Sequence, residues 1–187
     1  MNERHKENIR NTIIWRIPSI STFDSIVFKN DKPLVICDID ETILYLDEPQ
    51  SASNNFHLLY NKHKSLSYSS TYNNSRPVAR SIFPTDIQGF RRFEERISSL
   101  GGKLIFLTAR QSSGYQYVVE DFSKIGLDAS KYEIHYTGNV ISKGDYMRVR
   151  MDLSGYNDIY FIDDIKDNIL SVYQYFPQTK LYLFCRK

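Results

Sequence analysis

The sequence lacks the features that mark secreted and membrane proteins. Its cysteines are Cys37 and Cys185 alone, too few for a disulfide framework in a chain of 187 residues. No apolar stretch is long enough for a signal peptide or a membrane-spanning helix. We therefore expect a protein of the cytoplasm or of a host cell's interior, without a membrane partner.

An excess of charge of one sign is missing as well. The 24 lysines and arginines nearly balance the 22 aspartates and glutamates, for a formal net charge of +2. Without a strong basic field, a nucleic-acid partner is allowed but not favoured, and without an acidic excess the chain is not expected to be disordered. Internal repeats are absent, and 41% of the residues are hydrophobic. We expect one globular domain, residues 1–187, and the composition does not determine its oligomeric state.

Short apolar runs alternate with helical patterns along most of the chain, which is typical of a parallel sheet covered by helices. Residues 34–37 form a continuous apolar run, as expected of a strand buried on both faces. The further predicted strands are 103–107, 133–136, 158–162 and 180–185, and the predicted helices are 87–100, 115–125, 144–153 and 169–176. The predicted fold is α/β, a Rossmann-like, doubly wound and mainly parallel sheet with helices on both faces.

Helix and strand ends are predicted from local signals. Thr85 followed by Gln88 has the spacing of a capping box, so we expect the helix after it to begin there. At the N-terminal end, residues 12–17 and 21–28 are interpreted as an additional strand and helix packed on the core.

A segment rich in Ser, Asn and Tyr interrupts this alternation, and we interpret residues 48–84 as an insertion or small cap within the domain. It has no acidic residue between Pro49 and Pro84. Cationic and aromatic side chains alternate along it: Lys62, Lys64, Arg76 and Arg80 with Phe56, Tyr60, Tyr68 and Tyr72. This combination suits a phosphate with an attached ring, such as a nucleotide, and a flexible polar loop explains it equally well.

Polar residues follow the predicted strands directly, at the edge of the sheet where such folds bind ligands. They are Asp38 and Asp40, then Thr108 and Arg110, then Asp163 and Asp164, with Lys143 between the last two groups. Crowded carboxylates repel one another unless a hard cation neutralises them, and Mg²⁺ prefers such oxygen ligands. The pattern predicts a site that binds Mg²⁺ and phosphate.

The motifs around these residues resemble those of the haloacid dehalogenase (HAD) phosphatases. Asp38-Ile39-Asp40-Glu41-Thr42 is similar to motif I of that family, and the run 104–108 to motif II. Lys143 with Gly144 is similar to motif III, and Ile162-Asp163-Asp164 to motif IV. The four motifs occur in the family's order and cover residues 34–168.

The resemblance implies a role for each site residue. Asp38 would be the nucleophile and Asp40 the general acid and base, while Thr108 and Lys143 would bind phosphate. Asp38, Asp164 and the backbone carbonyl of Asp40 would hold the metal. Outer positions are implied for three others: Asp163 orients Lys143 or metal-bound waters, and Asp167 or Asn168 makes an outer contact. Apart from the resemblance, Arg110 is a candidate substrate contact because it follows a predicted strand, with a surface position as its alternative.

The predicted function is a Mg²⁺-dependent phosphomonoester hydrolase of the acid-phosphatase type, acting through an aspartyl-phosphate on a small phosphorylated metabolite or nucleotide. Two alternatives belong to other classes. A nucleic-acid end phosphatase would use the basic, aromatic insertion to hold a strand. A catalytically inactive HAD fold would serve as a binding protein, although the nucleophile, the acid and the metal carboxylates are all present.

Overall fold

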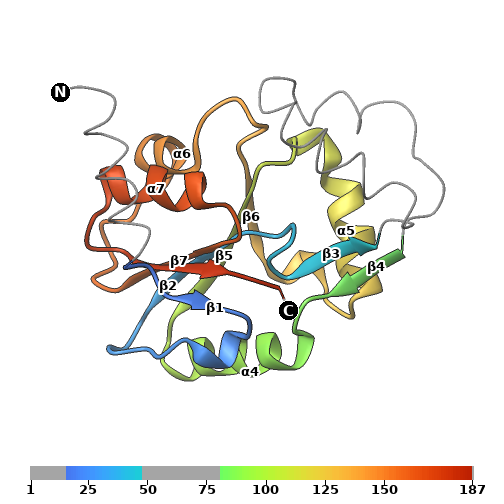
Figure 1. Ribbon diagram of the computed structural model, residues 1–187, viewed down its shortest axis with the longest axis horizontal. Coiled ribbons are helices and arrows are strands. Elements are labelled where there is room, and N and C mark those ends of the chain that lie inside the picture. Colours follow the sequence, from blue (N-terminus) through green and yellow to red (C-terminus); the bar gives the residue numbers. More distant parts are fainter. Residues whose placement is uncertain (1–15, 48–80, 187) are drawn as a thin grey trace.

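A computed structural model describes residues 16–47 and 81–186 of the chain (Figure 1). Six strands form one sheet in the order β1-β8-β7-β2-β5-β6, and every neighbouring pair is parallel. The strands are β1 (Ser19–Ile20), β2 (Leu34–Cys37), β5 (Lys103–Thr108), β6 (Glu133–Tyr136), β7 (Ile159–Asp163) and β8 (Lys180–Phe184). The helices are α4 (Ile87–Ser99), α5 (Tyr115–Lys124), α6 (Lys143–Arg150) and α7 (Lys166–Tyr175). The predicted Rossmann-like α/β fold is confirmed.

Strand order reverses direction beside β2. The chain builds outward from β2 through β5 to β6, and then returns to add β7 and β8 on the other side of β2. Such a switch point leaves a crevice at the carboxyl ends of the strands, where open α/β sheets bind ligands. The functional site is therefore expected after β2 and its two neighbours.

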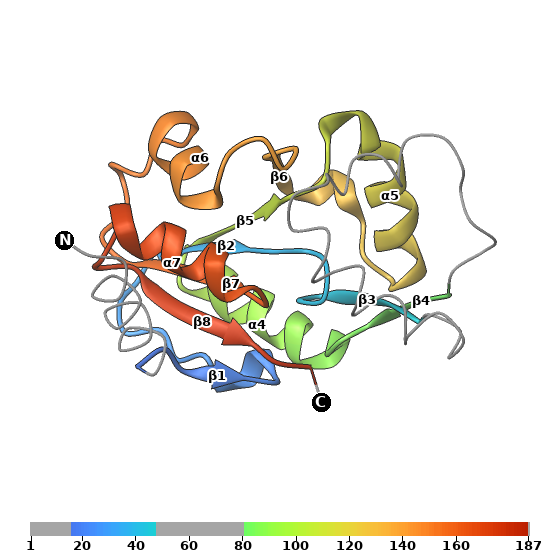
Figure 2. The ribbon, with the colours of Figure 1, turned by 45° about the horizontal axis from the view of Figure 1, so that its top comes forward.

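The sheet is buried on both faces, as the continuous apolar run of β2 predicted. Val35 and Cys37 belong to the core that α4 and α5 cover, whereas Leu34 and Ile36 belong to the core under α6 and α7. Figure 2 shows α6 and α7 together on one side of the sheet, with α4 on the other. Side chains alternate between the faces of a strand, so only an uninterrupted apolar run satisfies both cores.

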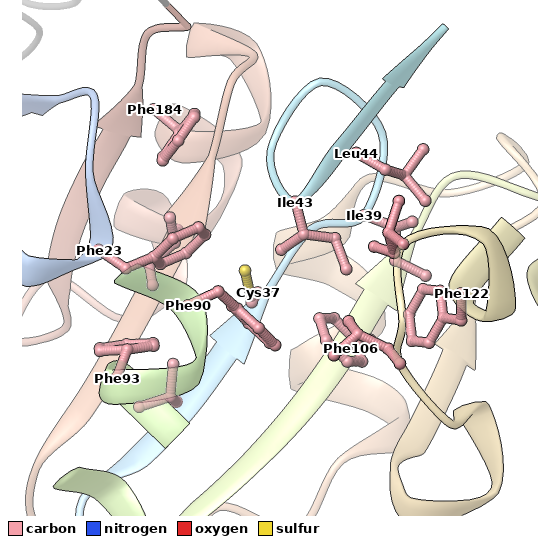
Figure 3. Close-up of a cluster of buried hydrophobic side chains, with 14 of the residues drawn as sticks. Phe23, Cys37, Ile39, Ile43, Leu44, Phe90, Phe93, Phe106, Phe122 and Phe184 are labelled. Atoms are coloured by element: carbon pink, nitrogen blue, oxygen red, sulfur yellow. The ribbon is translucent and has the colours of Figure 1, made fainter. Parts of the chain in front are cut away.

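Aromatic rings fill the core beneath α4 and α5. The ring of Phe106 on β5 packs edge-on against Phe122 of α5, with centroids 5.2 Å apart, and stacks on Phe90 of α4 at 6.1 Å. Figure 3 shows Phe90 beside Cys37 at the end of β2, with Phe106 next and Phe122 beyond it. This packing holds α5 against the strand that ends in Thr108.

A two-stranded antiparallel hairpin, β3 (Leu44–Asp47) with β4 (Ser81–Pro84), leads into and out of the insertion. These strands were not predicted, because a hairpin is recognised in sequence from a short turn and here 33 residues, 48–80, separate the strands. Within the predicted insertion 48–84, residues 81–84 form β4. Residues 48–80, with the basic and aromatic side chains of that segment, lie outside the described residues.

The N-terminal segment departs from its prediction where the structure describes it. Residues 12–15 of the predicted strand 12–17 lie outside the described residues, Arg16 and Ile17 form no strand, and β1 lies further on. Of the predicted helix 21–28, the 3-10 turn η1 (Phe23–Ser25) is the helical part. Arg96 of α4 donates to the carbonyl oxygens of Phe23 and Ile26, at 2.9 and 2.8 Å. These tertiary hydrogen bonds replace the ones that a longer helix would have made.

The predicted cap of α4 was off by one residue. Asp86 is the N-cap, and its carboxylate accepts from the backbone N–H of Gly89 at 3.0 Å. The hydroxyl of Thr85 instead donates to the carbonyl of Thr42, at 2.6 Å. Because the Thr85 hydroxyl is engaged with the loop after β2, the neighbouring Asp86 caps the helix instead. No helix among the described residues is both long and apolar enough to cross a membrane.

Candidate active site

Parallel register brings the ends of three strands together. Cys37, the last residue of β2, pairs with Phe106 of β5 and with Ile162 of β7. Asp38 follows directly, and its backbone N–H donates to the carbonyl of Ile162 at 2.9 Å. Asp38 and Asp163 thus lie on adjacent strands at the same level of the sheet. The predicted convergence of the strand-end residues is what the structure shows.

Lys143 reaches this edge from the first turn of α6. Its ammonium contacts Asp38 Oδ1 and lies 2.7 Å from Asp163 Oδ2, with the side chain only 2% exposed. Burial by itself would lower the pKa of Lys143, but the carboxylates of Asp163 and Asp38 outweigh it and raise that pKa. Lys143 is therefore a buried part of the site and not a solvated surface lysine.

Close packing of α6 on α7 gives Lys143 its position. Gly144 follows it, and a Cβ atom there would lie 1.9 Å from the carbonyl oxygen of Ser171. The N–H of Gly144 donates to Ser171 Oγ at 3.0 Å. A glycine is required because any side chain would push α6 away from α7.

Asp163 is wholly buried and held by donors. Asp163 Oδ1 accepts from the N–H of Ile165 at 2.8 Å, and the amide of Asn168 donates to both carboxylate oxygens, at 3.0 and 3.1 Å. With Lys143 on Oδ2, this carboxylate holds the lysine ammonium beside Asp38. Asn168 makes the contact next to Asp163, whereas Asp167 is exposed on the first turn of α7.

Asp38, Asp163 and Asp164 can hold a metal ion. Each offers a carboxylate oxygen, and the three oxygens lie within 4.8 Å of one another. Burial, with the charges of Asp38 and Asp163, raises the pKa of Asp164 to about 9. Burial likewise raises the pKa of Asp38 to about 7, although Lys143 opposes the rise. In the described part of the chain Asp164 forms no ion pair, so a bound cation would compensate its charge when it is ionised.

Arg110 binds Asp40 on the other side of the site. Its guanidinium donates from Nε to Asp40 Oδ2 at 2.9 Å and from Nη2 to Oδ1 at 2.6 Å. Burial would raise the pKa of Asp40, but Arg110 outweighs it and the pKa lies below its usual value. The hydroxyl of Thr108 also bonds to Asp40, and Thr108 Oγ1 accepts from the N–H of Arg110 at 3.2 Å. Arg110 is 8% exposed, which excludes a surface position.

Two residues at the site carry no role in the sequence analysis. Asp121, on the buried side of α5, accepts from Arg110 Nη1 at 2.8 Å. Thr42, the last residue of the first motif, is fully buried with its hydroxyl 3.5 Å from Asp38 Oδ2. An acidic residue among the apolar positions of an amphipathic helix is the signal that would have indicated Asp121.

The balance of charge across the site is negative. Five carboxylates, those of Asp38, Asp40, Asp121, Asp163 and Asp164, face two cations, Lys143 and Arg110. When all are ionised, three negative charges are in excess. A bound divalent cation would remove most of that excess, and it fits best beside Asp38 and Asp164, where the carboxylates outnumber the lysine.

These observations define a Rossmann-like α/β protein with a carboxylate-rich site at the carboxyl ends of its central strands. No protein-family model matches the sequence, and no curated protein matches it closely. Among solved structures, the fold is similar to the class C acid phosphatase from Bacillus anthracis. The tungstate-bound structure of that enzyme has 18% sequence identity and a TM-score of 0.46, and a second structure has 19% and 0.47. Each match covers 84% of this chain and 68% of the other. At this identity the similarity concerns the fold, and we argue function from the site itself.

Proposed function

We propose that this chain is a phosphomonoester hydrolase that uses Asp38 as its nucleophile and requires Mg²⁺. The observation that carries the proposal is the placement of Asp38. It sits at the end of a central strand, its Oδ1 contacts a buried lysine, and two further carboxylates lie beside it. A carboxylate so held can attack phosphorus and split one difficult displacement into two easier steps.

In the first step an oxygen of Asp38 forms a bond to phosphorus while the bond from phosphorus to the ester oxygen breaks. Arg110 keeps Asp40 ionised in the free protein, so Asp40, two residues further on, must take up a proton from solvent as the negatively charged phosphate binds beside it. It then gives that proton to the departing oxygen. In the second step water attacks the phosphorus of the aspartyl-phosphate, Asp40 takes a proton from that water, and Asp38 is released. Asp40 suits this exchange because 28% of its side chain is exposed and can meet the leaving group.

Lys143 and Thr108 are proposed to bind the phosphoryl oxygens. Lys143 Nζ already touches Asp38, so a phosphoryl group bonded to that carboxylate would lie within reach of the ammonium. Fixed donors at this place stabilise the negative charge that spreads over the oxygens as the group is transferred.

The carboxylates of Asp38 and Asp164, with the backbone carbonyl of Asp40, would hold Mg²⁺. Bound Mg²⁺ would neutralise part of the phosphate charge, and a dianionic substrate could then approach a carboxylate nucleophile. The fit rests on the excess of negative charge and on Asp164, which has no ion-pair partner among residues 16–47 and 81–186. Oxygen ligands are the donors that Mg²⁺ prefers.

Phosphate release from para-nitrophenyl phosphate tests the proposal. We expect turnover in Mg²⁺, none in excess EDTA, and none in an Asp38→Asn variant that keeps its fold by circular dichroism. Equal turnover with and without EDTA would contradict the metal assignment, and failure to hydrolyse any ester in a panel of phosphorylated metabolites would favour a binding protein. Preference for phosphorylated oligonucleotide ends in that panel would favour the nucleic-acid alternative.

A further inference from the structure

A buried carboxylate on α5 has no explanation in the core that surrounds it. Asp121 is 6% exposed and lies between Val118 and Phe122, which are both fully buried. An ionised carboxylate in such a place costs free energy unless a cation and hydrogen bonds compensate it. Its compensating partner is Arg110, at 2.8 Å.

Arg110 joins this carboxylate to the general acid. Three of its nitrogens are engaged, Nε and Nη2 with the two oxygens of Asp40 and Nη1 with Asp121. The backbone of Arg110 is also held, since its N–H donates to Thr108 Oγ1 and its carbonyl accepts from Gly138 at 3.1 Å. The guanidinium is therefore fixed at its base by β5 and at its far side by α5.

We propose that Asp121 is a positioning residue that acts through Arg110 on Asp40, an inference that rests on the phosphatase function proposed above. A planar guanidinium bonded to both oxygens of a carboxylate sets the orientation of that carboxylate plane. Asp121 prevents the guanidinium from turning with its partner. Each oxygen of Asp40 keeps a further lone-pair direction for the proton that it delivers.

The geometry explains why the third contact matters. Without Asp121, the guanidinium of Arg110 loses its contact with α5, and its pair with Asp40 can shift towards the solvent on the exposed side of Asp40. Proton transfer requires the donor to stay within hydrogen-bond reach of the leaving oxygen, and a displacement of about 1 Å can cost roughly 100-fold in rate. Asp121 therefore affects those substrates whose leaving group needs a proton.

A matched pair of substrates tests this dependence. Para-nitrophenyl phosphate releases a stable phenolate that needs little protonation, whereas para-nitrobenzyl phosphate has nearly the same size and releases an alkoxide that needs it fully. For Asp121→Asn, kcat/KM on the benzyl ester should fall by about 10- to 100-fold, while on the phenyl ester it should change by less than about threefold. The ratio kcat/KM reports leaving-group departure and not the later hydrolysis of the phospho-enzyme.

The control is Asp158→Asn. Asp158 is also buried, at 4% exposure, and forms an ion pair with Lys180, but it precedes β7 at the end of that strand opposite to Asp163. Its loss should lower the melting temperature and leave the ratio of the two kcat/KM values unchanged. Should Asp121→Asn not fold, Arg110→Lys tests the same point, since it keeps the charge without the fork and should show the same selective loss.

A double variant separates positioning from general damage. In an Asp40→Asn background the acid is absent, so adding Asp121→Asn should change kcat/KM on para-nitrobenzyl phosphate by less than about twofold. Two outcomes would overturn the inference: equal losses of kcat/KM on both esters from Asp121→Asn, or an undiminished loss of kcat/KM in the Asp40→Asn background. In either case, turnover by the wild-type protein would still support the phosphatase function. A wild-type protein that hydrolyses neither ester would overturn the function and the inference together.

Discussion

Lys143 and Asp163 form an ion pair of 2.7 Å in which the two side chains are 2% and 0% exposed. The same ammonium contacts Asp38, so one lysine compensates two buried carboxylates. Removing one member of a buried ion pair leaves an uncompensated charge, which costs far more than a surface pair contributes. The stability and the chemistry of this site are therefore linked through Lys143.

We predict that Lys143→Met abolishes turnover and destabilises the protein by about 3–5 kcal/mol, because methionine keeps the volume and removes the charge. The deficit should shrink as the pH falls through about 7, the pKa of Asp38, because protonation of Asp38 removes one of the charges left unpaired. Urea unfolding of both proteins at pH 5 and pH 8 measures this. A deficit that is the same at both pH values would contradict the proposed origin.

Stability of the metal-free protein should decrease as the pH rises. The pKa of Asp164 is raised from 3.8 to about 9 and that of Asp38 from 3.8 to about 7, so folding favours the protonated forms. That contribution is complete below about pH 4 and is lost as the pH rises, through about 7 for Asp38 and about 9 for Asp164. Melting curves in EDTA across this range measure the loss.

Mg²⁺ should restore the stability lost at alkaline pH. The ion binds the ionised carboxylates of Asp38 and Asp164, and the ionised forms predominate above the pKa values of these two groups. In an Asp164→Ala variant the added ion should raise the melting temperature little, and the alkaline loss in EDTA should be smaller than in the wild type. Undiminished stabilisation by Mg²⁺ in that variant would contradict the placement of the ion.

The two acids of the first motif should fail differently. Asp38→Asn should abolish turnover and leave no phospho-enzyme, because an amide cannot form the acyl phosphate. Asp40→Asn should slow both steps by about 10²- to 10⁴-fold each, yet with para-nitrophenyl phosphate it should still transfer phosphate to Asp38 and then stall. Rapid-quench mass spectrometry of the peptide that contains Asp38 distinguishes the two. Phosphate found on Asp40 would reverse the assignment.

Gly144→Ala should reduce activity although residue 144 contacts no substrate. A Cβ atom at this position meets the backbone of Ser171 at 1.9 Å, so α6 must move and carry Lys143 away from Asp38. We expect a loss of about 1–3 kcal/mol in stability together with a lower kcat. Gly155→Ala is the matched control, because nothing lies within 4 Å of a Cβ atom there, and both properties should stay near wild type.

The ends of the strands could be predicted because a strand buried on both faces is a continuous apolar run in the sequence. The run 34–37 and the alternation of later strands and helices predicted the fold and the edge at which Asp38, Thr108 and Asp163 meet. The hairpin of β3 and β4 was missed since short, partly covered strands far apart in the chain have neither a full apolar run nor a turn signal. The 3-10 turn at Phe23 was not predicted, because the hydrogen bonds from Arg96 to the carbonyl oxygens of Phe23 and Ile26 come from a residue far away in the sequence.

The sequence by itself determined which chemical groups this protein carries and on which edge of the sheet they stand, because chain direction and apolar pattern follow from local residues. Only the tertiary structure decided the partners. Lys143 and Asp38 are 105 positions apart and Arg110 and Asp40 are 70 apart, so no local pattern joins them. Whether a lysine is solvated or buried, and whether an arginine meets one carboxylate or two, depends on how closely α5 and α6 pack on the sheet. That closeness comes from side-chain volumes across the whole core, such as the stacked rings of Phe90 and Phe106 and the missing side chain of Gly144.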